Sequence, residues 1–393
     1  MAGAEPTGDR PADDGPLRVM LVDDSAVIRG MVGRWLEAEP DIEVVATAAN
    51  GALAVRQVAR ANPEVVILDI EMPEMDGLTA LPEILKQVRG VRVLMSSTLT
   101  RAGAEVSMKA LTLGAADYLT KPSSTREAGT VDAFRAELVA KVRALGQAAR
   151  RRNRLIGRPA VSAAPAPAPA FGIAKRPPPP APAAPAVVAL RAPGTVRPQV
   201  IAIGSSTGGP QALAAVLGTM AQRVEQPILI TQHMPATFTA ILAEHLARSS
   251  GVPAAEGVDG EAIQGRRIYV APGNRHMLVD RSGNQRVIRL TDDPPENFCR
   301  PSVDPMLRSI AAAYGPAVLT VILTGMGQDG LVGGRAIVAA GGTVLAQDEA
   351  SSVVWGMPGA VATAGICAAV LPLGEIGAAV ERMARGPLLA GVR

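Results

Sequence analysis

The sequence predicts an α/β protein made of two doubly wound parallel-sheet domains joined by a linker rich in Pro and Ala. In two separate stretches, apolar runs of strand length alternate with helical stretches, which is typical of a parallel sheet covered by helices on both faces. Between them, residues 148–198 contain Pro177–Pro180 and cannot bury a core. We therefore expect a disordered tail over 1–16, a first domain over 17–147, a linker over 148–198 and a second domain over 199–389.

The first domain contains five apolar runs of strand length with helical stretches between them. The expected strands are Arg18–Asp23, Val44–Ala48, Val65–Asp69, Val91–Ser96 and Asp117–Thr120. The expected helices include Ser25–Glu37, Ala52–Ala61 and a last helix around Val131–Leu145.

The second domain repeats this alternation, with one interruption. The expected strands are Val200–Ile203, Ile228–Thr231, Arg267–Val270, Val318–Leu323 and Thr343–Ala346. A hairpin of Met277–Asp280 with Val287–Leu290 interrupts the pattern around Ser282-Gly283-Asn284.

The distribution of charge argues against a nucleic-acid partner. Residues 148–198 hold nine Lys or Arg and no acidic residue, and with the whole chain at +3 the remainder carries a net charge of −6. A nucleic-acid-binding domain would carry its basic charge on a folded face. We interpret Arg150–Arg154 as a solvated helix end.

Cysteine usage and hydropathy indicate the compartment. Cys299 and Cys367 are the two cysteines of the 393 residues, and neither lies in a metal-binding spacing, which fits a reducing environment. No secretory signal opens the chain, and no apolar run reaches the roughly 20 residues of a membrane span. We expect a cytoplasmic monomer that does not insert into a membrane.

Polar side chains end four of the strands expected in the first domain. Asp23 and Asp24 end the first strand, Asp69 the third, Ser97 the fourth and Lys121 the fifth. In an open α/β sheet, ligands bind outside the carboxyl ends of the strands. Three carboxylates at one point repel each other unless a cation lies among them, and Mg²⁺ prefers oxygen ligands. A carboxylate can also attack phosphorus, and a Lys and a hydroxyl can then hold the phosphoryl oxygens.

This pattern, from Leu17 to about Gly146, resembles the receiver domain of bacterial response regulators, which has a flavodoxin-like fold. The resemblance implies that a sensor histidine kinase donates the phosphoryl group and that Mg²⁺ is required. The implied roles are Asp69 as phosphoacceptor, Asp23, Asp24, Asp69 and the Glu71 carbonyl as metal ligands, and Ser97, Tyr118 and Lys121 as switch residues. Receivers control many outputs, so this half does not name the function.

The second domain opens with a strand, a Gly-rich turn and a helix. Gly204–Gly208 matches G-x-S-x-G, a motif that presents Ser206 on a sharp turn at a helix N-terminus. On this segment alone, a nucleophilic serine and a phosphate-binding turn are equally good interpretations.

The histidines favour the nucleophile. His233 directly follows a strand, as Ser206 does, whereas His245 lies within a helix and His276 follows a turn and opens a strand. Asp329 is the one acid in the loop after the strand Val318–Leu323. A serine, an imidazole and a carboxylate to orient it are the minimum set for acyl transfer.

The order Ser206, His233, Asp329 differs from that of the α/β-hydrolases and of the best-known serine proteases. Both the order and the local sequences resemble the catalytic domain of chemotaxis protein-glutamate methylesterases (the CheB family), a Rossmann-like hydrolase. The matching segments are Ile203–Pro210, Ile230–Phe238, Ile268–Met277, Arg300–Asp304, Leu323–Gly330 and Asp348–Gly359.

That resemblance implies Ser206 as nucleophile, His233 as general base and acid, and Asp329 as orienter, with no cofactor for the ester hydrolysis. Thr207 and Met326 are candidates by position for donating oxyanion hydrogen bonds from their N–H groups. The implied substrates are glutamate γ-methyl esters on chemoreceptors, and also specific receptor glutamines, which are deamidated. The competing interpretation is a response regulator with a non-catalytic binding output, which leaves His233 and Asp329 without a role.

Overall fold

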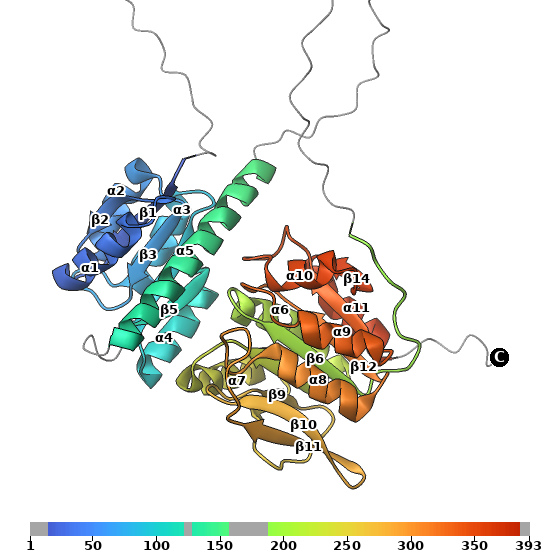
Figure 1. Ribbon diagram of the computed structural model, residues 1–393. Coiled ribbons are helices and arrows are strands. Elements are labelled where there is room, and N and C mark those ends of the chain that lie inside the picture. The colour runs from blue at the N-terminus through green and yellow to red at the C-terminus, as the bar shows by residue number, and fades with distance from the viewer. Residues whose placement is uncertain (1–14, 122–127, 157–187, 386–393) are drawn as a thin grey trace, which may run out of the picture.

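The computed structural model describes residues 15–121, 128–156 and 188–385. Figure 1 shows an N-terminal body in blue to cyan, a long green helix and a C-terminal body in green to red. Each body contains a parallel sheet with helices packed against it, so the predicted fold class is confirmed. The predicted tail lies almost entirely outside the described residues.

The N-terminal domain is a five-stranded parallel sheet in the order β2-β1-β3-β4-β5. Its strands are β1 Leu17–Val22, β2 Ile42–Ala48, β3 Val65–Asp69, β4 Arg92–Thr98 and β5 Asp117–Lys121. Its helices are α1 Ala26–Glu37, α2 Gly51–Ala61, α3 Gly77–Gln87, α4 Arg101–Thr112 and α5 Ala128–Ile156. β3 is buried along its whole length, as expected for the centre of such a sheet.

Four of these helices begin at a side chain that caps them. The capping oxygens belong to Ser25, Asn50, Asp76 and Thr100, and each accepts a backbone N–H from the first turn. Such caps satisfy donors that a helix start leaves unpaired. These caps fix where the helices that follow β1, β2, β3 and β4 begin.

The linker is shorter than the sequence predicted. α5 continues to Ile156, through residues that we had assigned to the linker, because Ala149 on its inner face is fully buried. At the other end, the N–H of Gly194 donates to the Thr343 hydroxyl at 2.8 Å, so this part packs on the second domain. Residues 157–187 lie outside the description.

The C-terminal domain is a seven-stranded parallel sheet in the order β14-β13-β12-β6-β7-β9-β8. Its strands are β6 Val200–Ser205, β7 Ile228–Gln232, β8 Ala254–Glu256, β9 Ile268–Val270, β12 Val318–Ile322, β13 Thr343–Gln347 and β14 Ala369–Leu371. Its helices are α6 Gly209–Met220, α7 Ala236–Ser250, α8 Val303–Tyr314, α9 Leu331–Ala339, α10 Met357–Thr363 and α11 Leu373–Ala384, with a short 3-10 turn η1 at Ala221–Arg223.

The predicted hairpin is present as β10 His276–Ser282 and β11 Gln285–Thr291. Sequence patterns missed β8 and β14, because each has three half-buried residues and no periodicity. β6 lies between β12 and β7, so the loops after these three strands meet at one edge of the sheet. Within the described residues, no helix combines the length and apolar character that a bilayer crossing requires.

Candidate functional site

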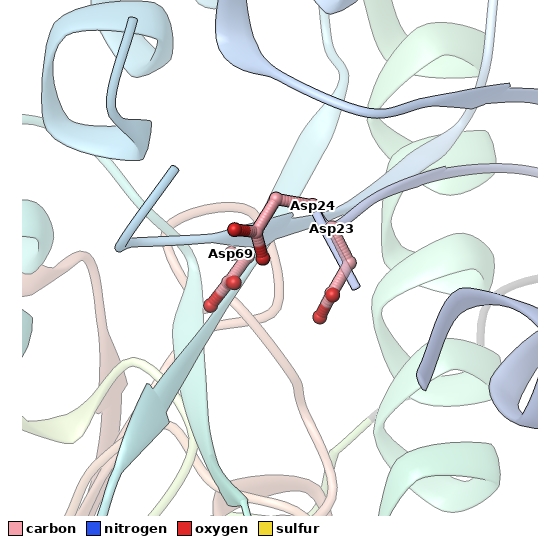
Figure 2. Close-up of side chains that lie close together, drawn as sticks. All are labelled: Asp23, Asp24 and Asp69. Atoms are coloured by element: carbon pink, nitrogen blue, oxygen red, sulfur yellow. The ribbon is translucent and has the colours of Figure 1, made fainter. Parts of the chain in front are cut away.

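Three carboxylates gather at the carboxyl edge of the N-terminal sheet. Asp23 and Asp24 follow β1, Asp69 ends β3, and one oxygen from each lies within 4.8 Å of the others. Figure 2 shows the three side chains around one point. Asp23 and Asp69 are buried and Asp24 is exposed. An oxygen cluster that is partly open to solvent fits Mg²⁺, which keeps several of its waters.

Lys121 is the counter-charge of this cluster. Its Nζ lies 3.0 Å from Asp23 Oδ2 and 2.8 Å from Asp69 Oδ2. Burial raises the pKa of Asp69 to about 6; Lys121 opposes this rise, and the charge of Asp23 adds to it. One ammonium therefore does not fully compensate the buried carboxylates, and a divalent cation would.

The predicted switch residues Ser97 and Tyr118 have different partners in this structure. The Ser97 hydroxyl accepts a hydrogen bond from the Ser107 hydroxyl at 3.0 Å. Tyr118 is buried, and its ring stacks on Phe238 of the C-terminal domain with centroids 4.5 Å apart. Glu71 lies in the loop after β3 with its side chain exposed. Tyr118 thus belongs to the contact between the two domains.

Ser206 lies on the turn between β6 and α6. Its N–H donates to the Thr324 carbonyl at 3.0 Å, and its carbonyl accepts from the Gln232 amide at 2.9 Å. Gly208 has a φ of +77°, which favours glycine. A Cβ on Gly325 would lie 2.9 Å from the Ser206 Cβ, so only glycine allows the loop after β12 to approach this closely.

His233 follows β7, and both ring nitrogens have a partner. Nε2 lies 2.8 Å from Asp329 Oδ2, and Nδ1 lies 3.3 Å from Cys299 Sγ. Because Asp329 binds Nε2, Nδ1 is the nitrogen that remains to take a proton from Ser206. In this arrangement the Cys299 thiol occupies that nitrogen.

Asp329 is buried and held by a dense set of donors. Three come from the start of α8, where the dipole also favours negative charge. Besides His233, the donors are the Ser302 hydroxyl (2.8 Å), the N–H groups of Val303 (2.6 Å), Asp304 (3.0 Å) and Gly330 (3.0 Å), and the Asn297 amide (3.0 Å). This carboxylate is fixed in position and kept ionised.

The imidazole and the carboxylate shift each other's pKa. Burial lowers the pKa of His233, but Asp329 and Cys299 outweigh burial and raise it to about 10. Burial raises the pKa of Asp329, but His233 and the backbone donors outweigh it and lower the value to about 2. Each group of the pair therefore favours the charged form of the other.

The loop 294–302 supplies residues that sequence reasoning missed. Asn297 joins Asp329 to the buried carboxylate of Asp304, which also accepts the N–H groups of Gly330 and Gly333. Cys299 lies in the same loop. Asp304 is the last residue of the matching segment Arg300–Asp304. The local sequence, however, does not show which side chains Asp304 contacts elsewhere in the fold.

The other two histidines have different surroundings. His276 is buried, accepts the N–H of Ser302 at Nδ1 and has Nε2 3.1 Å from the Pro294 carbonyl, so it braces the loop 294–302. His245 on α7 is half-buried, and burial together with Arg248 lowers its pKa. His276 therefore holds the loop that carries Asn297.

The N-terminal domain contacts the turn that carries Ser206. The Thr207 hydroxyl donates to Asp117 Oδ2 at 2.8 Å, and Lys141 Nζ lies 3.1 Å from the same oxygen. The Gln211 amide donates to the Ala115 carbonyl at 2.7 Å. The Met326 side chain packs against an apolar cluster that mixes residues of both domains. Both oxyanion candidates therefore lie at or beside the contact between the domains, where α4 packs against α7, as Figure 1 shows.

These features define a two-domain response regulator whose second domain places Ser, His and Asp side chains at one sheet edge. The response regulator receiver domain model matches residues 19–130, and the CheB methylesterase model matches residues 201–380. A protein-glutamate methylesterase/protein-glutamine glutaminase 1 of Paramagnetospirillum magneticum is 60% identical over 95% of this chain and 97% of its own length. A protein-glutamate methylesterase/protein-glutamine glutaminase of Azospirillum brasilense is 57% identical over 96% of this chain and 95% of its own length. The chain belongs to the protein-glutamate methylesterase/protein-glutamine glutaminase family.

Among solved structures, the Thermotoga maritima CheB methylesterase catalytic domain is 36% identical, with a TM-score of 0.47 over 48% of this chain and 100% of that chain. The response regulator domain of Thermotoga maritima CheB is 38% identical, with a TM-score of 0.30 over 33% of this chain and 94% of that chain.

Proposed function

We propose that this chain is a phosphorylation-activated esterase that hydrolyses glutamate γ-methyl esters of chemoreceptors and deamidates specific receptor glutamines. Ser206 is the nucleophile, His233 the general base and acid, and Asp329 the orienter. The observation that carries the proposal is the His233–Asp329 pair, 2.8 Å apart, at the sheet edge where β6 presents Ser206. A non-catalytic binding output would leave this buried pair without a role.

The proposed reaction is an acyl transfer. Ser206 Oγ attacks the ester carbonyl while His233 Nδ1 takes its proton, and the N–H groups of Thr207 and Met326 would stabilise the oxyanion. His233 then returns the proton to the leaving methanol. Water, activated by the same nitrogen, releases glutamate from the acyl-enzyme. A primary amide follows the same steps and releases ammonia.

The general base must be neutral and free at Nδ1 before it can act. In this arrangement Cys299 occupies Nδ1, and the raised pKa keeps His233 protonated. Activation therefore requires the thiol to leave Nδ1, so that the nitrogen turns to Ser206. The loop that carries Cys299 contains Asn297 and Phe298 at positive φ, and Phe298 is fully exposed, so little packing on that side chain resists such a movement.

The receiver controls access to the turn that carries Ser206. Asp23, Asp24, Asp69 and the Glu71 carbonyl would hold Mg²⁺, which neutralises charge when a sensor histidine kinase donates its phosphoryl group to Asp69. Lys121 and Ser97 would then hold phosphoryl oxygens. When the Ser97 hydroxyl binds the phosphoryl group, its hydrogen bond with the Ser107 hydroxyl would be lost.

Rearrangement along β4 and β5 then loosens the stacking of Tyr118 on Phe238 and the bond from Thr207 to Asp117. A shift of about 1–3 kcal/mol between closed and open arrangements changes activity tenfold or more. We further propose that the chain acts as a monomer, with a sensor histidine kinase and the receptors as its partners.

Methanol release from methyl-esterified receptors tests the proposal. Ser206→Ala should abolish release while Asp69 remains phosphorylatable. Ser249→Ala, on the exposed side of α7, is the matched control and should keep the full rate. Substantial release by Ser206→Ala would exclude Ser206 as nucleophile.

A further inference from the structure

A basic pocket lies where the end of α5 meets the C-terminal domain. It has a volume of about 470 Å³, and its walls include Arg92 at the start of β4, Arg151, Arg152 and Arg154 on α5, and Glu349 and Trp355 from the second domain. Figure 1 shows the C-terminal part of α5 extending beyond the first domain on the side of α10. The pocket is lined by both domains, and its lining includes neither the acid cluster nor Ser206.

The charged side chains of this pocket are mainly basic. Its lining holds the guanidinium groups of Arg92, Arg151, Arg152 and Arg154 and one carboxylate, Glu349, which lies 3.4 Å from Arg151. The Nε of Arg92 is buried and has no hydrogen-bond acceptor among the described residues. Burial and the charge of Arg152 lower the pKa of Arg92 to about 10. Buried donors of this kind are normally satisfied, so an acceptor is expected here.

The segment that follows α5 carries no carboxylate. Residues 148–198, which include the end of α5 and that segment, contain no Asp or Glu. A negative charge beside Arg92 and Arg152 would therefore come from elsewhere in the chain or from a ligand.

The other wall of the pocket suits a flat ring. The Trp355 indole N–H donates to the Gln347 carbonyl at 3.0 Å, which fixes the ring, and Val353 lies beside it in the lining. Guanidinium groups bind phosphate through paired N–H donors, and aromatic rings stack on bases. The volume lies within the range of about 300–1,000 Å³ that is typical of small-ligand sites.

We propose that this pocket binds a nucleotide with two or more phosphate groups, with the phosphates on Arg92 and Arg152 and the base against Trp355. The ligand joins α5 to the loop 349–355. That loop is hydrogen-bonded to Gly325, beside Ser206, because the Gly325 N–H donates to the Val354 carbonyl at 3.0 Å. A bound nucleotide therefore holds the two domains together and opposes activation by phosphorylation.

Tryptophan fluorescence tests this directly. The chain has two tryptophans, so Trp35→Phe leaves Trp355 as the sole reporter in the full-length protein. ADP, GTP, adenosine and pyrophosphate are titrated without Mg²⁺, which keeps the receiver site silent. We expect saturable change with ADP or GTP, at least tenfold weaker binding of pyrophosphate, and none with adenosine. Pyrophosphate binding as tightly as both nucleotides would overturn the nucleotide assignment.

Substitutions locate the binding. Arg152→Gln, on the exposed end of α5, should weaken nucleotide binding at least tenfold, and Arg92→Gln should do the same. Arg60→Gln on α2 is the control and should bind as the parent does. Unchanged binding by both pocket variants, or no saturable change with either nucleotide, would overturn the proposal. Because the signal is fluorescence, such a failure says nothing against the esterase proposal.

The N-terminal segment is the internal competitor for the pocket. Residues 1–14 contain Glu5, Asp9, Asp13 and Asp14, and Arg150 on α5 donates to the carbonyl of Pro16, near the first described residue. If deletion of residues 1–14 alone changed Trp355 emission as saturating nucleotide does, the pocket would belong to the chain's own acidic tail and the proposal would be overturned. We expect no such change.

Discussion

The two domains each bury a carboxylate at the carboxyl edge of a parallel sheet, and the two carboxylates have opposite electrostatic environments. The pKa of Asp69 is raised to about 6, whereas that of Asp329 is lowered to about 2. Both are almost fully buried, so burial alone does not explain the difference. What differs is the number of hydrogen-bond donors around each group.

Asp329 accepts from a hydroxyl, an amide and three backbone N–H groups besides His233. Asp69 accepts the Ile70 N–H and pairs with Lys121, while Asp23 repels it. A carboxylate with many donors is preorganised and keeps its charge, which suits an orienter. A carboxylate with few donors beside another acid is stabilised by a cation, which suits a group that reacts only after Mg²⁺ binds.

The same chemical change at the two positions should therefore have opposite results. Asp329→Asn should lower hydrolysis on the order of 10⁴-fold, because the imidazole loses its orienting charge, and should spare phosphorylation of Asp69. Asp69→Asn should abolish phosphorylation and stimulation while the unstimulated hydrolysis rate stays. Methanol release and phosphoryl transfer, measured on both variants, check this. Loss of the unstimulated rate in Asp69→Asn would contradict the separation of the two sites.

The stability of the first domain should depend on pH and on Mg²⁺. A pKa raised from 3.8 to about 6 means that the folded chain binds the Asp69 proton more tightly than the unfolded chain does. The contribution of Asp69 to the free energy of unfolding is therefore fully present below pH 3.8 and is lost as the pH rises through about 6. At pH 7 Asp69→Asn should thus raise the Tm, by roughly 4 °C for each 1 kcal/mol.

Mg²⁺ should raise the Tm of the parent and not that of Asp69→Asn. Calorimetry at pH 7, with and without Mg²⁺, measures both. An equal response of the two proteins to Mg²⁺ would show that the ion does not act at the acid cluster.

The substitution Cys299→Ala should have the smallest effect of these changes, a shift of the pH–rate profile. The contact of the Cys299 thiol with Nδ1 helps to raise the pKa of His233, so Cys299→Ala should lower that pKa, and the neutral base should form at lower pH. The midpoint of the pH–rate profile should move downward by a fraction of a pH unit to about one unit. Cys367→Ala is the control, because that thiol is buried in the apolar core of the second domain. Superimposable profiles would mean that Cys299 does not influence the base.

Much of this comparison was visible in the sequence. Residues that follow a strand in a parallel sheet meet at one edge, so the positions of Asp23, Asp69, Ser206 and His233 followed from periodicity alone. The fold class followed from the same alternation of strands and helices.

The sequence could not predict the surroundings of these residues. Asn297 and Cys299 reach the catalytic edge from a loop without regular structure. The contact of Tyr118 with Phe238 joins residues of different domains, and local patterns hold no information about such pairs. The sequence predicted a last helix that ends around Leu145, whereas α5 continues to Ile156 through Ala and Arg residues, which are both good helix formers.

A fluorophosphonate probe tests most directly the claim that the receiver controls an activated serine. The probe labels a serine whose proton a base can take, so labelling of Ser206 reports the open arrangement without any receptor. With Mg²⁺ and a small phosphodonor, we predict at least tenfold faster labelling, located at Ser206 by mass spectrometry, and no acceleration in Asp69→Asn. Labelling at an equal rate with and without the phosphodonor, or labelling absent from Ser206, would contradict the account.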